Sequence, residues 1–181
     1  MFLYARSFRD AAKKLAEATE PDSGSTDIEA CPVVFLYRHA LELQLKAIIL
    51  GDGGNFLATK PDPLTISKTH SVSWLAQFVS QIIVALGWEP EFKCLGIENL
   101  DEFKAAVEEV NSVDPGSYPL RFPGETDKGS FNVREFAANM DALLELLHAA
   151  ADALAAEWDL RSGVVAIDAN QNGGGFEPTI Q

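Results

Sequence analysis

Four ionisable residues stand in an almost wholly apolar stretch, and they are the first candidates for chemistry in this chain. The stretch runs from Val33 to Leu50 and carries Arg38, His39, Glu42 and Lys46. At about 100° per residue in a helix, all four side chains are expected on one face. Arginine and lysine can hold a phosphate, and a histidine can transfer or donate a proton. The spacing therefore predicts either a binding or catalytic cleft or an internal ion-pair network that fixes helix packing.

The same stretch is expected to form a helix buried inside the protein. Pro32 suits a first helical turn, and Gly51 is a typical C-terminal stop. Its length would suit a membrane span, but four ionisable groups make that costly, so we expect no membrane contact. Arg38–Glu42 and Glu42–Lys46 are i,i+4 pairs of opposite charge. Because an unpaired buried charge costs several kcal/mol, other polar groups must meet this face.

Two residues elsewhere in the chain are candidates for meeting it. His70 lies at the start of a helix expected from about residues 69–71 to Leu86, where it could equally be a capping or surface residue. Arg121 precedes Phe122 and Pro123 in a segment biased to extended backbone, and it could face either Glu42 or a phosphate. The pocket would then have catalytic candidates His39, Glu42 and His70, and phosphate-binding candidates Arg38, Lys46 and Arg121.

No metal or cofactor is expected at this pocket. His39, Glu42 and His70 are metal-ligand types, but no H-E-x-x-H or Cys/His spacing accompanies them. The chain also has no phosphate-binding glycine-rich loop that follows a strand, and no G-x-S-x-G turn.

The stretch from Tyr37 to Leu50 resembles a helix of HEPN-like proteins, which often reads Y-x-H-A-x-E-x-x-L-K-A. The segment His70–Leu75 is similar to the H-x-L-x-x-L segment that follows it in bacterial members, with Val72 at the first leucine. The segment Leu120–Pro123 resembles the R-[YF]-P that precedes their last long helix. The resemblance implies a helical bundle, commonly dimeric. It also implies a metal-independent endoribonuclease, or a nucleotide-binding module, of defence and toxin–antitoxin systems.

One departure from that family concerns its R-x(4–6)-H ribonuclease motif. The family's arginine contacts the scissile phosphate, and its histidine assists proton transfer at the 2′-hydroxyl. Arg134 occupies the matching place, but E-F-A-A and then Asn139 follow it. Asparagine cannot act as a general base near neutral pH. Arg134 and Asn139 are therefore expected to bind a phosphate or nucleotide at most, without the family's cleavage.

The rest of the chain predicts an all-α, up-and-down bundle of about five helices. They are expected at residues 2–19, 33–50, about 69–86, 99–111 and about 132–158. Residues 51–69 are expected to be a loop, and residues 114–129 are expected to be a long proline- and glycine-containing loop before the last long helix. We expect one domain at residues 1–161, and a flexible tail at 162–181 because of its triple glycine.

Composition narrows the class of partner. The formal net charge of −13 disfavours non-specific nucleic-acid binding and suits a basic partner. Cys31 and Cys94 lie far apart, so reduced thiols are expected. The first ten residues have no signal-peptide pattern, so a cytoplasmic protein is expected.

Three functions remain open on the sequence. The first is a dimeric HEPN-like interaction or regulatory module without catalysis, or a nucleotide- or RNA-binding one. The second is a ribonuclease or nucleotide-processing enzyme that uses the His39, Glu42 and Lys46 face. The third is a structural acidic bundle that docks a basic protein. A sealed polar face favours the first function, and an open pocket that holds Arg121 and a histidine favours the second.

Overall fold

The computed structural model describes residues 1–18, 27–113 and 132–171, and all of its regular structure is helical. The helices are α1 (Phe2–Ala18), α2 (Asp27–Leu50), a 3-10 helix η1 (Asp52–Phe56), α3 (Pro63–Lys68), α4 (Val72–Leu86), α5 (Leu100–Val113) and α6 (Val133–Gln171). No strand occurs among these residues. The prediction of an all-α helical bundle is confirmed.

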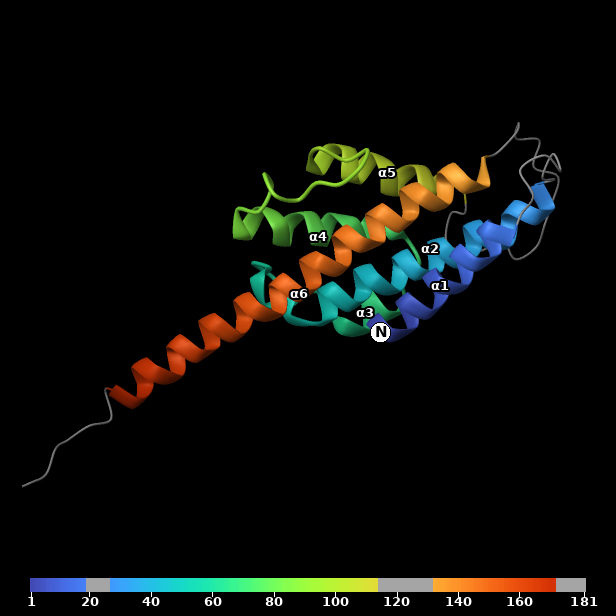
Figure 1. Ribbon diagram of the computed structural model, residues 1–181. Helices are drawn as coiled ribbons and strands as arrows, with labels where there is room; N and C mark the ends of the chain where they lie inside the picture. The colour runs from blue at the N-terminus through green and yellow to red at the C-terminus, as the bar shows by residue number, and fades with distance from the viewer. Residues whose placement is uncertain (19–26, 114–131, 172–181) are drawn as a thin grey trace, which may run out of the picture.

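Helix α2 is the centre of the bundle, as predicted (Figure 1). Helices α1, α3, α4 and α6 all pack against it. It begins at Asp27, earlier than predicted, so Pro32 lies inside the helix rather than in its first turn. The side chain of Pro32 is exposed, while Ala30 before it and Val33 and Val34 after it are buried.

The expected ends of the helices follow from their capping residues. Ser71 accepts a hydrogen bond from the Trp74 amide at the start of α4, and Gly87 ends that helix at φ +70°. Asn99 accepts from the amide of Glu102 at the start of α5, and Asn132 accepts from the amide of Glu135 at the start of α6.

The segment predicted as a loop after α2 contains two short helices, η1 and α3. The sequence signal for α3 is the pair Asp62 and Pro63. The Asp62 carboxylate accepts hydrogen bonds from the amides of Leu64 and Thr65, and proline suits the first helical position. Ile66 is fully buried and anchors this helix in the core. The prediction of a loop was wrong here because the capping pair was not recognised.

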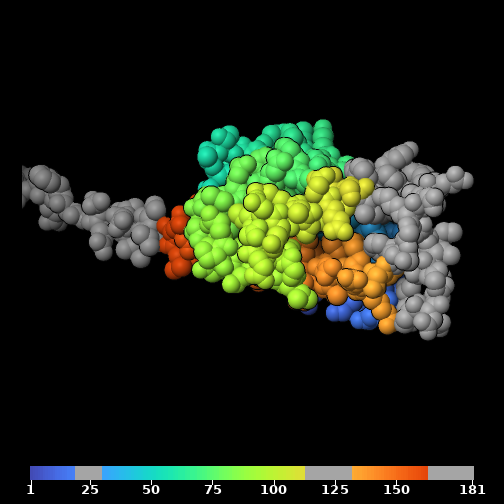
Figure 2. Space-filling view, turned by 90° about the horizontal axis from the view of Figure 1, so that it is seen from above, coloured from blue at the N-terminus to red at the C-terminus, as the bar shows by residue number. Residues whose placement is uncertain are grey.

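Helix α6 is the longest element, and its C-terminal part extends beyond the rest of the bundle (Figures 1 and 2). The predicted end of the helix near Trp158 is too early, since the helix continues to Gln171. The domain boundary at residue 161 stays a prediction, and residues 172–181 of the predicted tail lie outside the described residues. A glycine such as Gly163 costs a helix only about 1 kcal/mol, so it does not have to end there.

A single hydrophobic core joins all six α-helices. Among the described residues, none of the helices combines the length and the apolar character that crossing a bilayer requires.

Candidate functional site

Three of the four predicted residues on α2 form a buried charged row. Arg38, Glu42 and Lys46 expose 0%, 2% and 4% of their surface. They stand one helical turn apart, so their side chains line up along α2. Charges buried this deeply need compensation by partners at hydrogen-bond distance.

Both oxygens of Glu42 have such partners. Its Oε2 accepts a hydrogen bond from Arg38 Nη1 at 3.1 Å. Its Oε1 accepts one from Lys46 Nζ at 2.8 Å and lies 3.0 Å from Nδ1 of His70. We call Arg38, Glu42, Lys46 and His70 the Glu42 network.

Arg38 and Lys46 also donate hydrogen bonds to backbone carbonyls of residues that follow α2 in the chain. Lys46 Nζ donates to the carbonyl oxygen of Ser67 at 2.9 Å, and Arg38 Nη2 donates to that of His70 at 2.5 Å. The Ser67 carbonyl belongs to the last turn of α3, where carbonyls lack helical partners and a positive charge is favoured. The network therefore joins α2 to the end of α3 and the start of α4.

These partners also determine the charge state of Glu42. Burial alone would raise the pKa of its carboxyl group. The hydrogen bond and positive charge of Lys46 outweigh burial, with help from His70 and Arg38, and the pKa of Glu42 lies below its ordinary value. Glu42 is therefore a carboxylate at neutral pH, held by its neighbours.

His70 is the member of the network that reaches solvent. About half of its side chain is exposed, at 53%. It does not cap α4, because Ser71 does so. Its backbone carbonyl accepts from Arg38, and its ring nitrogen contacts Glu42. The sequence did not predict that one residue would join the network through both groups.

His39 lies on a different side of α2. Its ring makes an edge contact with Phe8 of α1, with centroids 4.5 Å apart, and it stacks on Phe35 at 6.1 Å. One residue of helix rotates a side chain by about 100°, which turns His39 away from Glu42 toward α1. The expected common face therefore holds for Arg38, Glu42 and Lys46 but not for His39.

Arg134 and Asn139 line separate cavities on α6. Arg134 lines a cavity of about 440 Å³ together with Tyr37 and Asp141. Asn139 lines a groove of about 420 Å³ between α5 and α6. Arg121, with the whole segment Leu120–Pro123, lies outside the described residues.

A second polar cluster, which sequence reasoning missed, joins α1, α2 and α6. Arg9 Nε donates to Asp141 Oδ1 at 2.9 Å, and the Tyr37 hydroxyl donates to the same oxygen at 3.2 Å. Lys13 Nζ lies 3.3 Å from the other oxygen, and Glu145 accepts from Arg9. Burial and the Asp141 carboxylate raise the pKa of Tyr37. The available signal was Asp141, an acidic residue beside the apolar stripe of α6.

Two basic residues of α1 belong to this second cluster. Arg9 and Lys13 contact Asp141 in a partly buried cluster, so neither is a simple solvated residue. Among the described residues, no group of three or more His, Cys, Asp and Glu side chains lies close enough to hold a metal ion.

The Glu42 network predicts a large effect of removing its anion. Glu42→Gln leaves two buried cations without a negative partner, which should lower the free energy of unfolding by about 3–5 kcal/mol. The matched control is Glu108→Gln on the exposed face of α5, which should change it by less than about 0.5 kcal/mol. Denaturant unfolding measures both variants. Equal effects would contradict a structural role for Glu42.

The lowered pKa of Glu42 predicts how this effect depends on pH. A carboxyl group whose pKa is lower in the folded state stabilises the fold above its unfolded pKa of about 4.3, and this stabilisation is lost as pH falls through the folded pKa. The difference in unfolding free energy between the natural chain and Glu42→Gln should therefore be constant from pH 5.5 down to about 4.5 and shrink below it. Urea titrations at several pH values measure it. A difference that grows on acidification would contradict the assignment.

Comparison of the chain with protein-family models, with curated proteins and with solved structures found no match. Its function must be argued from the residues and geometry described above.

Proposed function

We propose that this chain is a HEPN-like helical module that acts as a homodimer in protein interaction or regulation and does not catalyse a reaction. The observation that carries the proposal is the closed state of the Glu42 network. Arg38 and Lys46 would be the phosphate-binding groups of a catalytic pocket, yet both donate to Glu42 and to backbone carbonyls. A phosphate would have to displace a buried carboxylate from two cations, and this favours a structural role.

The sequence of α6 supports the same proposal. The family's ribonuclease motif needs a histidine separated from its arginine by four to six residues, and Asn139 stands at that spacing, four residues separating it from Arg134. An amide side chain has no titratable proton near neutral pH. The net charge of −13 also favours a basic protein over nucleic acid as the partner.

A second candidate function is a metal-independent ribonuclease or nucleotide-processing enzyme centred on His70. The observation in its favour is the pair formed by His70 and Glu42, in which a half-exposed imidazole lies 3.0 Å from a carboxylate. Carboxylates orient catalytic histidines in this way. The pair alone does not supply a phosphate-binding cation, because Lys46 and Arg38 are engaged by Glu42 itself.

The proposal predicts a dimer that leaves RNA and nucleotides intact. Light scattering on the purified 181-residue chain should give twice the monomer mass. Incubation with mixed RNA and with nucleoside triphosphates at several pH values should yield no product by electrophoresis or chromatography. Asn139→His restores the family's spacing on an exposed position of α6, and this variant should cleave RNA if the chain is a degenerate HEPN nuclease.

Two results would contradict the proposal. One is a monomer at all concentrations tested. The other is cleavage by the natural chain that His70→Ala abolishes while Glu108→Ala, at an exposed site on α5, does not. The second result would establish the enzyme centred on His70.

A further inference from the structure

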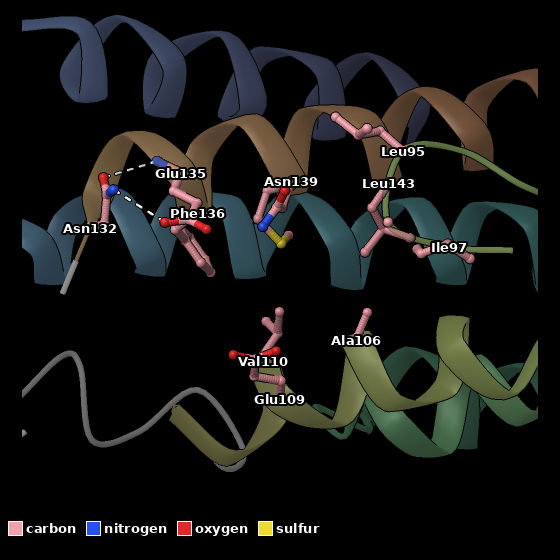
Figure 3. Close-up of a pocket in the computed structure, with 12 residues that line it drawn as sticks. Leu95, Ile97, Ala106, Glu109, Val110, Asn132, Glu135, Phe136, Asn139 and Leu143 are labelled. Carbon is pink, nitrogen blue, oxygen red and sulfur yellow. Dashed lines mark hydrogen bonds between the residues drawn. The ribbon is translucent and has the colours of Figure 1, made fainter.

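A groove between α5 and α6 is built of two chemically different ends (Figure 3). α5 packs mainly on α4 rather than on α6, and this leaves the space of about 420 Å³ between them. Its floor is apolar and buried, and includes Val110, Met140 and Leu143. In Figure 2 the outer surfaces of α5, in yellow, and of the first turns of α6, in orange, lie side by side on one face.

One end of the groove is acidic and the other is apolar. Glu135 of α6 lines the end where α6 begins, and the Asn132 amide donates to Glu135 Oε2 at 3.2 Å. Glu109 of α5 lines the groove nearer its middle, opposite the stretch of α6 between Phe136 and Asn139. Leu95 and Ile97 line the opposite end, from the turn that precedes α5. Leu95 exposes 78% of its surface there. Among the described residues that line the groove, two are acidic and none is basic.

We propose that this groove binds a basic amphipathic helix of another protein. The apolar face of that helix lies on the floor of the groove, and its lysine or arginine residues face Glu109 and Glu135. The inference rests on the proposed function, because it names the class of partner that the interaction module would take. Helix-in-groove recognition uses this combination of an apolar floor and a charged rim.

The length of the groove suits a helical occupant. Its lining on α6 runs from Asn132 to Leu143, which at 1.5 Å per residue is about 16 Å, or about three helical turns. The ridge of a third helix can pack into the space between two helices. An occupant with apolar residues at i, i+3 and i+7 would fill it.

Charge argues against a second copy of this chain as the occupant. If the grooves of two copies faced each other, each copy would bring the carboxylates of Glu109 and Glu135 to the contact. Like charges brought together at an interface are destabilising, whereas a basic partner gains from both the rim and the overall field.

The test uses a fluorescein-labelled helical peptide of about 18 residues, long enough to form a helix on binding. Leucines form one of its faces, and lysines lie at the edge of that face. Fluorescence anisotropy with the full 181-residue chain should show saturable binding. A peptide with the same leucines but with glutamate in place of lysine should bind at least about tenfold more weakly. A peptide of scrambled leucine and lysine order should bind equally weakly.

Matched variants locate the binding. Glu109→Lys should weaken it about tenfold, whereas Glu108→Lys, the neighbouring exposed residue that does not line the groove, should weaken it by less than about threefold. Leu95→Asp should also weaken it about tenfold although it adds a negative charge, whereas Leu160→Asp, which adds the same charge at another exposed leucine, should not. All four sites are exposed, so melting curves should stay close to that of the natural chain.

Several outcomes would overturn the inference. These are no saturable binding up to about 1 mM peptide, equal binding of the glutamate peptide, or equal effects of Glu108→Lys and Glu109→Lys. Conversion of a dimer to a monomer by Leu95→Asp would also overturn it, because the groove would then join two copies. A chain that binds the peptide at the groove but is a monomer throughout would support this inference while contradicting the dimeric part of the proposed function.

Discussion

The buried carboxylate of Glu42 is the interaction on which the arrangement of this protein depends. Water solvates a carboxylate far better than a protein interior does, so α2 can occupy the centre of the bundle only if Glu42 is neutralised there. Arg38 and Lys46 supply the charge from the same helix. Their remaining donors then need acceptors, and the carbonyls of Ser67 and His70 supply them. The position of α3 and of the start of α4 follows from satisfying those donors.

These structural requirements also bear on the function of the protein. A catalytic or phosphate-binding pocket needs cations that can exchange one anion for another, and such cations are usually accessible to solvent. Arg38 and Lys46 are buried beneath the residues that follow α3, and only His70 of the network is half-exposed. Among the described residues, the groups that a partner can reach lie instead in the groove between α5 and α6 and on the acidic surface. These features support the proposal of an interaction module.

The sequence predicted several features that depend on local spacing, although the local cap of α3 at Asp62 was missed. Residues four apart on a helix are neighbours, so the Arg38–Glu42–Lys46 row followed from the order of the residues. The starts of α4, α5 and α6 followed for the same reason, because Ser71, Asn99 and Asn132 each cap amides within the first turn of their own helix.

Features that depend on distant segments were not predicted. Arg9 and Asp141 meet across 132 residues, and nothing in the local spacing of either residue indicates the other. His39 was expected beside Glu42, but the position of α1 and Phe8 determines its surroundings. The family resemblance also depends partly on Arg121, which lies outside the described residues. The family assignment therefore remains a prediction.

The central claim is that the Glu42 network holds α3 and the start of α4 against α2, and amide hydrogen exchange tests it most directly. Lys46→Met removes the donor to Ser67 while keeping an unbranched side chain of similar length. The described contacts predict that amides of residues 64–69 exchange at least about tenfold faster in this variant, while those of Leu100–Val113 keep their rates. Lys104→Met, on the exposed face of α5, should change neither segment. Unchanged exchange in α3 of the Lys46→Met variant would contradict the account.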